Sequence, residues 1–349
     1  MVSPAAVSST RRPSRRSRAC YAIARRTLLV QVRRSVAYQG DRAVEERLAL
    51  IGRRINALAR LQRLRPRRGL RTSRITLGQV TLETIRTAES AHRPLSDGVI
   101  LYLHGGGFFL GGFDTHSHVV VALARQTRLP VVHVEYRQHP DVTVDESVAD
   151  CLRAYRWLLD QGADPANTIV AGDSAGGFLS FATVLAAQAQ GIGTPAGVIG
   201  VSPLLELDGE RRSGHANFAE DRMGIGLALP MIVECVGPKN SDAHALSPVN
   251  GVLTDFPPSL IIAAESEALR CDAERMHEVL TEAGRSSTLK LWPGQLHAFP
   301  AFLPFLPESR EARDCMVEFI QDCLGTSKRS APGTADTVTG SGSAKSPSA

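Results

Sequence analysis

A glycine-rich turn in the middle of the chain joins an apolar run directly to a helical pattern. Residues 168–171 are typical of a buried strand, and residues 175–190 place apolar side chains along one stripe of a helix. Between them, Gly-Asp-Ser-Ala-Gly at 172–176 has a glycine two positions before and two positions after Ser174. Because side chains at those positions would collide with neighbouring elements, the spacing indicates a strained turn that lifts the Ser174 hydroxyl above a sheet. A strand-to-helix turn without chemistry is the alternative interpretation of this motif alone.

The chain from about residue 98 onward alternates short apolar runs with longer helical patterns. The runs are almost continuously apolar, as strands covered on both faces should be. Predicted strands span residues 98–103, 130–135, 168–171, 197–201, 259–263 and 288–291, and predicted helices span 145–161, 175–190 and 271–283. This alternation predicts an α/β protein whose mostly parallel central sheet has helices on both faces.

A second glycine motif, His-Gly-Gly-Gly at 104–107, follows the predicted strand that ends at residue 103. Consecutive glycines let backbone amides face a carbonyl oxygen without obstruction by side chains, which is what an oxyanion hole needs. A phosphate-binding loop is the competing interpretation, but no Lys-Ser/Thr pair follows and the spacing is not G-x-G-x-x-G. The motif lies about 70 residues before Ser174. The two motifs in this order favour a catalytic serine.

With these motifs the chain resembles the hormone-sensitive-lipase-like family of α/β-hydrolases over roughly residues 75–324. The likeness rests on His-Gly-Gly-Gly-Phe at 104–108, Gly-Asp-Ser-Ala-Gly-Gly at 172–177, Ser-Pro at 202–203 and 247–248, and Gly-Gln-Leu-His-Ala-Phe at 294–299. The resemblance implies the α/β-hydrolase fold with a helical cap, and a carboxylic ester hydrolase that acts on short- to medium-chain acyl esters. It also implies that Ser174 is the nucleophile and that the amides of Gly106, Gly107 and Ala175 form the oxyanion hole.

His297 is the predicted general base. It follows the last predicted strand and the Pro-Gly turn at 293–294, where the histidine of a Ser-acid-His order falls. His104 and Gly105 are expected to orient the oxyanion loop instead of acting in proton transfer. Asp173, beside the nucleophile, is expected to buttress that loop or the turn.

The acid that should hold His297 is less determined by the sequence. The family's usual aspartate segment is replaced by Glu-Ser-Glu-Ala-Leu-Arg-Cys-Asp at 265–272. Matching Leu269 to the family's leucine puts Glu267 at the acid position, and a glutamate can hold an imidazolium as an aspartate does. Glu265 and Asp272 stay open as alternatives.

The implied reaction is acyl transfer to water. Ser174 attacks an ester carbonyl while His297 takes its proton, and water then resolves the acyl-enzyme. This chemistry requires no cofactor and no metal, and none is predicted. An amidase, a thioesterase or a transacylase would use the same triad. A catalytically impaired homologue that only binds ligands is the alternative from another class of protein.

The predicted domain organisation places helical and disordered segments around one α/β domain. It comprises a disordered basic tail at 1–18, N-terminal cap helices at 19–74, an α/β-hydrolase domain at 75–324 and a disordered tail at 325–349. Apolar spacing predicts two basic amphipathic helices between residues 20 and 64, with Pro66 and Gly69 ending the second. Residues 207–245 are longer than an ordinary crossover and are predicted as a cap insertion.

The positive charge of the chain is concentrated at its N-terminus. Residues 1–74 hold 20 arginines and three acids, although the net charge of the whole chain is only +5. Such a segment suits nucleic acid or an anionic membrane surface. Arginine outnumbers lysine throughout the chain and no base-reading motif is present, so no nucleic-acid partner is predicted, while peripheral membrane contact stays open. A small-molecule ester is the expected partner, and the resemblance implies a homodimer through the edge of the last strand.

Targeting signals are weak. No apolar run approaches the roughly 18 residues of a membrane span, and two arginines interrupt the apolar run 23–32 that a secretory signal would need intact. The six cysteines show neither a metal-binding nor a disulfide pattern. A soluble protein of the reducing cytoplasm is therefore expected.

Overall fold

A single twisted sheet organises the molecule. The computed structural model describes residues 7–8, 12–36, 41–60, 68–238 and 242–325. Within these ranges the sheet has nine strands in the order β1-β9-β8-β7-β6-β4-β5-β3-β2. The strands are β1 (Val7–Ser8), β2 (Leu70–Leu77), β3 (Val80–Thr87), β4 (Val99–Leu103), β5 (Val131–Glu135), β6 (Thr168–Asp173), β7 (Gly197–Val201), β8 (Ser259–Ala264) and β9 (Ser287–Trp292). Only the β2–β3 and β3–β5 pairs are antiparallel, so the predicted mostly parallel sheet is confirmed.

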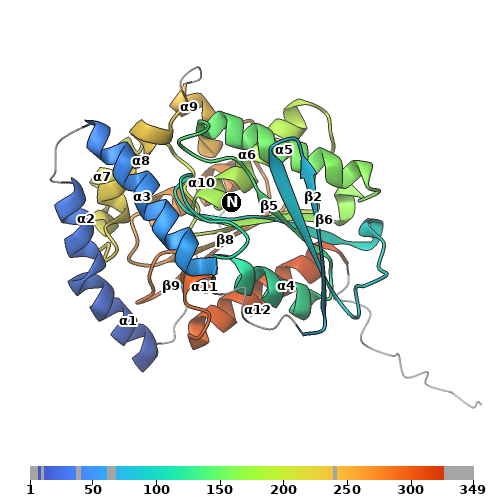
Figure 1. Cartoon of the computed structure of the whole chain (residues 1–349), viewed down its shortest axis with the longest axis horizontal. Helices are drawn as coiled ribbons and strands as arrows, with labels where there is room; N and C mark the ends of the chain where they lie inside the picture. Colours follow the sequence, from blue (N-terminus) through green and yellow to red (C-terminus); the bar gives the residue numbers. More distant parts are fainter. Residues whose placement is uncertain (1–6, 9–11, 37–40, 61–67, 239–241, 326–349) are drawn as a thin grey trace, which may run out of the picture.

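Helices cover both faces of this sheet (Figure 1). They include α4 (Ser117–Thr127), α5 (Val144–Asp160), α6 (Ala175–Ala189), α10 (Arg270–Glu282), α11 (Phe299–Phe302) and α12 (Pro307–Cys323). Side chains of a strand alternate between faces, and β4 shows the result. Leu101 belongs to the core under α5, α6 and α10, whereas Ile100 and Tyr102 belong to the core under α4 and α12. Burial on both faces explains why these strands are apolar along their whole length.

The antiparallel hairpin β2–β3 is absent from the predicted strands. Most of β2 is exposed, and its Arg-Thr-Ser-Arg stretch at 71–74 has no apolar alternation that would indicate a strand. The partner strand β3 is mostly buried. A turn at Gly78 connects it to β2, and an ion pair of 2.7 Å joins Arg74 of β2 to Glu83 of β3. The predicted boundary between residues 74 and 75 therefore falls inside β2, and the sheet domain begins earlier than expected.

The N-terminal segment forms helices from Arg15 onward. They are α1 (Arg15–Arg26), α2 (Leu28–Val36) and α3 (Asp41–Ala59), three where two were expected. The expected disorder of residues 1–18 is wrong for the described part, because the Ser14 hydroxyl accepts the Ser17 amide at 3.1 Å and caps α1. The predicted helix end at Pro66 lies outside the described residues. None of the helices in the described ranges has the length and apolar character needed to cross a membrane.

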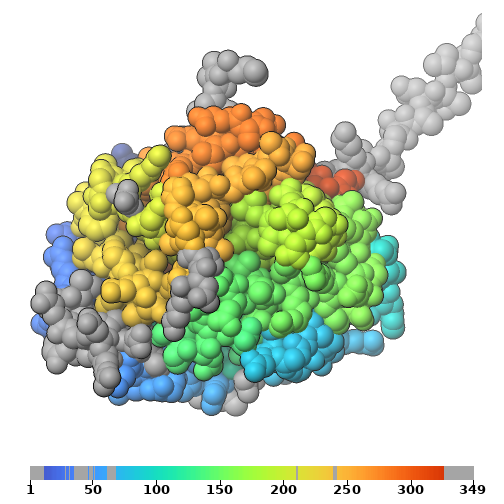
Figure 2. Space-filling model, turned by 90° about the horizontal axis from the view of Figure 1, so that it is seen from above, coloured from blue at the N-terminus to red at the C-terminus, as the bar shows by residue number. Residues whose placement is uncertain are grey.

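The insertion between β7 and β8 is helical and lies beside the N-terminal helices. It contains α7 (Glu210–Gly214), α8 (Ile225–Val236) and α9 (Ala243–Leu246). Helix α2 packs against the start of α8, where Leu29 and Val32 contact Gly224. Seen from above, the yellow insertion and the blue N-terminal residues lie along the same side of the molecule (Figure 2). Of the predicted tail 325–349, all but Gly325 lies outside the described residues.

A buried ion pair attaches this insertion to the sheet domain. Asp272, in the first turn of α10, accepts the amides of Leu205 and Glu206 at 2.9 and 3.0 Å. The same carboxylate receives Nε and Nη2 of Arg212 in α7, both at 2.9 Å. Burial would lower the pKa of Arg212, but the charge and hydrogen bonds of Asp272 raise it. Asp272 thus joins three segments and is fully occupied in doing so.

The edge of β9, through which the resemblance implied a dimer, is covered. Val7 and Ser8 of β1 pair in parallel with Lys290 and Leu291 of β9. The hydrogen-bonding edge of a strand can pair only once. A second copy of the chain could therefore not add a strand to β9 at these two residues.

We expect Asp272→Ala to lower the free energy of unfolding by about 3–5 kcal/mol, because Arg212 would remain buried without a counter-charge. Urea unfolding followed by circular dichroism measures the loss. The matched control is Asp255→Ala, which removes an exposed aspartate and should change stability by about 0.5 kcal/mol or less. Equal losses in the two variants would contradict the structural role of the ion pair.

Candidate active site

Ser174 sits at the tip of a strained turn between β6 and α6. Its backbone angles are φ 54° and ψ −119°, a conformation that costs energy for any residue with a side chain. Packing maintains it: a Cβ on Gly176 would stand 2.0 Å from the Leu103 carbonyl oxygen, and one on Gly172 would stand 2.3 Å from the Gly176 carbonyl oxygen. Only glycine fits these positions, which is the collision that the sequence spacing indicated.

His297 lies between Ser174 and Glu267. Its Nε2 is 2.8 Å from Ser174 Oγ, and its Nδ1 is 2.6 Å from Glu267 Oε2. The three residues follow β6, β9 and β8, whose carboxyl ends meet at the same edge of the parallel sheet. An imidazole held between a serine hydroxyl and a carboxylate can take the proton of the hydroxyl.

The length of the Glu267 side chain is accommodated by a turn. Its second oxygen, Oε1, accepts the amide of Ala264 at 2.8 Å, so the carboxylate folds back over the end of β8 before it meets His297. Of the two alternative acids, Asp272 is engaged elsewhere, because its carboxylate is paired with Arg212. Glu265 forms backbone hydrogen bonds with Trp292 and Arg270.

The charges around His297 favour its protonated form. Burial by itself would lower the pKa of His297, but the hydrogen bond and the charge of Glu267 raise it above the ordinary value, with a further contribution from Asp221. Asp221 belongs to the insertion, where it accepts the amides of Met223 and Gly226 at 3.0 and 2.8 Å at the start of α8. Burial raises the pKa of Asp221 itself.

The glycine loop 104–107 lies against the Ser174 turn. A Cβ on Gly106, whose φ is +125°, would stand 1.9 Å from the carbonyl oxygen of Leu110, and Gly107 has φ +61°. A Cβ on Gly105 would stand 2.4 Å from Asp173 Oδ2. Ala175 opens α6, so its amide is one of the first-turn donors without an intrahelical acceptor. Gly105 is thus the glycine of this loop that packs directly against the serine turn, since its Cβ would also stand 3.1 Å from the Cβ of Ser174.

Asp173 connects this loop to the serine turn. Its Oδ1 accepts the Tyr102 hydroxyl at 2.7 Å and the Gly105 amide at 3.3 Å, and its Oδ2 lies 3.2 Å from His116 Nε2. Burial would raise the pKa of Asp173, but His116 and the Tyr102 hydrogen bond outweigh it and lower the pKa. The Asp173 carboxylate thus accepts hydrogen bonds from Tyr102 and from the amide of Gly105 in the loop.

His104 is a neutral part of the loop. Burial, with the nearby charge of His116, lowers the pKa of His104 to about 3. Its Nδ1 lies 2.8 Å from the Gly105 carbonyl oxygen, and its ring stacks on Tyr136 with centroids 4.4 Å apart. A ring of this pKa is a poor proton acceptor near neutral pH. In the described part of the chain, no three His, Cys, Asp or Glu side chains converge in a way that could hold a metal ion.

Sequence reasoning missed four residues that position this site. Ser202 Oγ accepts the amide of Ala298, next to His297, at 2.9 Å. Asn56 of α3 accepts the Gly111 amide at 3.0 Å and so connects α3 to the segment that follows the glycine loop 104–107. His116 and Asp221 are the others. Only Ser202 carried a usable signal, a polar residue directly after a buried parallel strand.

Comparison with known proteins gives the family of the chain and the class of its relatives. A family model described as the alpha/beta hydrolase fold matches residues 100–301. The carboxylesterase/phospholipase LipF of Mycobacterium tuberculosis is 32% identical over 273 residues, which cover 76% of this chain and 73% of that protein. The acetyl-hydrolase of Streptomyces hygroscopicus is 33% identical over 252 residues, covering 72% of this chain and 83% of that protein. A crystal structure of an esterase from the bacterial hormone-sensitive lipase family has 27% identity and a TM-score of 0.69, covering 87% of this chain and 99% of that one.

The chain belongs to the α/β-hydrolase fold family, in its hormone-sensitive-lipase-like group. It is a serine hydrolase of the carboxylesterase and lipase type.

The surroundings of His297 predict its titration. We expect its pKa, measured from imidazole proton shifts by NMR, to lie above the ordinary value of 6.5. Glu267→Gln removes the negative charge that favours the imidazolium, so the pKa should fall in that variant. Glu265→Gln, a matched control two residues away, should leave it unchanged. A pKa that responded to Glu265 and not to Glu267 would contradict the arrangement.

Proposed function

We propose that this enzyme hydrolyses esters of short- to medium-chain carboxylic acids through an acyl-enzyme formed on Ser174. The observation that carries the proposal is the chain of two short contacts, 2.8 Å from Ser174 to His297 and 2.6 Å from His297 to Glu267. His297 takes the hydroxyl proton as Ser174 Oγ attacks the ester carbonyl, and then donates it to the departing alcohol. Water attacks the acyl-enzyme with His297 again as the base.

In this proposal, Glu267 and a set of three backbone amides support the proton transfer. Glu267 holds the Nδ1–H tautomer and stabilises the imidazolium, while its other oxygen is fixed on the Ala264 amide. The amides of Gly106, Gly107 and Ala175 stabilise the oxyanion of the tetrahedral intermediate. Loss of one such donor typically raises the barrier by about 3 kcal/mol. Asp173 and His104 act in this scheme only by holding the loop.

The preference for short acyl groups rests on two supports. One similar protein is an acetyl-hydrolase. In addition, the insertion packs closely beside the proposed acid: a Cβ on Gly226 would stand 2.8 Å from the Cβ of Ala268, the residue after Glu267. A cap seated this tightly restricts the space available to a long acyl chain.

The proposal includes a cellular setting. All six cysteines lie within the described residues and none is in a disulfide, which suits the reducing cytoplasm. The arginines of α1 and α2 suit peripheral contact with an anionic membrane surface. A homodimer is also part of the proposal, with a contact that does not use Lys290 and Leu291 of β9, because β1 pairs with them.

Replacement of two of the proposed catalytic residues, Ser174 and Glu267, should separate their roles. We expect Ser174→Ala to lower kcat on p-nitrophenyl acetate by on the order of 10⁶-fold, and Glu267→Gln by on the order of 10⁴-fold because the imidazole loses its orienting partner. Glu265→Gln should stay close to the wild-type enzyme. A fluorophosphonate probe should label Ser174, as located by mass spectrometry. A folded wild-type enzyme that escaped labelling would refute the proposed acyl-enzyme on Ser174. A fully active Glu267→Gln variant would refute the assignment of Glu267 as the acid.

The acyl preference is tested by a chain-length series. With p-nitrophenyl esters from two to sixteen carbons, we expect kcat/KM to peak at short to medium chains and to fall for the longest, because the closely packed cap excludes them. Matched p-nitroanilides, run as the control for amidase activity, should react orders of magnitude more slowly than the esters. A maximum at the longest chain, or comparable rates on anilides, would overturn this part of the proposal.

A further inference from the structure

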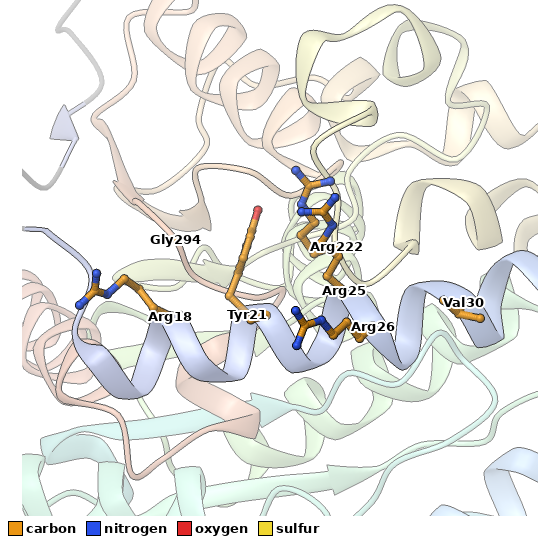
Figure 3. Close-up of a pocket in the computed structure, with 8 residues that line it drawn as sticks. Arg18, Tyr21, Arg25, Arg26, Val30, Arg222 and Gly294 are labelled. Atoms are coloured by element: carbon orange, nitrogen blue, oxygen red, sulfur yellow. The ribbon is translucent and has the colours of Figure 1, made fainter.

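A cavity of about 680 Å³ is lined by α1, by Arg222 of the insertion and by Gly294, in the loop that carries the proposed base. Figure 3 shows Arg18, Tyr21, Arg25 and Arg26 projecting from α1, with Arg222 of the insertion facing them. Positions 18, 21, 22 and 25 follow helical spacing, so they form one stripe of α1. The stripe is therefore a continuous wall of the cavity, and Arg222 stands on the opposite wall.

The charge of this cavity is strongly unbalanced. Among the described residues, four arginines line it and no carboxylate does. Within the described ranges these arginines form one ion pair, between Arg222 and Glu220 at 3.1 Å. The side chain of Glu220 is 58% exposed. The Nε of Arg222 is buried and has no hydrogen-bond partner among the described residues. Guanidinium groups gathered around one space repel each other unless an anion lies between them.

The rest of the lining adds apolar surface. Ala22 and Val30 also face the cavity, and Val30 is 39% exposed. The volume falls in the range of small-molecule sites and is far larger than an inorganic anion needs. The chemistry that fits is an anionic head carried on a partly apolar body.

We propose that this cavity is a binding site for a phosphate group borne by a small amphiphilic molecule. Arginine forks bind phosphate oxygens in bidentate fashion, and four guanidiniums match the charge of a phosphate better than that of a single carboxylate. Arg25 and Arg26 bind from the last turn of α1, and Arg222 supplies its buried donor from the insertion. A soluble organic phosphate and the headgroup of a membrane phospholipid share this chemistry.

The site is distinct from the catalytic groups but touches the segments that hold them. The Tyr21 hydroxyl donates to Ser266 Oγ at 2.9 Å, one residue before Glu267. Gly294 lines the cavity three residues before His297, and its carbonyl oxygen accepts the Ser17 hydroxyl at 3.3 Å. A bound phosphate therefore bridges α1 and the insertion across the outer side of these loops. Its binding does not depend on the proposed ester hydrolysis.

Two arms of one binding experiment test the site and distinguish its sources. Isothermal titration with glycerol 3-phosphate measures a soluble ligand, and co-sedimentation with phosphatidylcholine vesicles containing phosphatidylglycerol measures a headgroup. The pocket variant is Arg25→Gln/Arg26→Gln. The control is Arg33→Gln/Arg34→Gln, because both pairs are exposed arginines in the last turn of a helix and both changes remove the same charge. Thermal unfolding verifies that each variant is folded.

We expect binding in at least one arm, weakened about tenfold or more by the pocket variant and little by the control. Arg222→Lys keeps the charge but loses the planar fork, so it should also weaken binding and serves if the double variant fails to fold. Binding of glycerol 3-phosphate would identify a soluble phosphate, and binding of vesicles alone would identify a lipid headgroup. An equal loss of binding in the pocket and control variants would show only a general electrostatic attraction to the arginines, and would overturn the proposed site. The absence of binding in both arms would overturn it as well. Neither readout involves turnover, so a failure here is separate from a failure of the hydrolase mechanism.

Discussion

The direct contact of backbone with backbone at the β6–α6 turn is the constraint on which the rest of the site depends. Gly176 is packed against the end of β4 and Gly105 against Asp173, with no room for a methyl group at either place. The serine turn and the glycine loop therefore form one rigid unit. The strain at Ser174 persists because neither partner can move away without losing this contact. Rigid placement of both parts is what an oxyanion-stabilising site requires.

The fold and two of the proposed catalytic residues could be predicted because their signals are local. The run before Ser174 and the Pro-Gly turn before His297 each place a residue at the end of a strand without reference to any distant segment. The resemblance placed the acid at Glu267 and left Glu265 and Asp272 open as alternatives. In the structure Glu267 lies 2.6 Å from His297, and Asp272 is engaged by Arg212, sixty positions away in the chain. A contact at that separation leaves no trace in local spacing.

The wrong predictions for the N-terminal part of the chain have a similar physical origin. A Ser/Arg/Pro composition indicates disorder because it offers little apolar surface to bury. Here polar bonds replace apolar burial: the Ser17 hydroxyl, which is buried, donates to Gln295 at 2.8 Å, and Ser14 bonds to Glu308. The exposed β2 strand was missed for the same reason, because its partner β3 supplies the order. The composition of a segment describes that segment in isolation. The N-terminal segment and β2 are ordered by their contacts with other parts of the chain.

The bond between Ser14 and Glu308 joins parts of the chain that are 294 positions apart. Helix α1 begins at this bond and α12 contains its acceptor, so the bond links the two helices directly. The bond exists only while both helices are in place. A disturbance of α12 can therefore reach α1, whose Ser17 and Tyr21 contact Gln295 and Ser266 in the loops that carry His297 and Glu267.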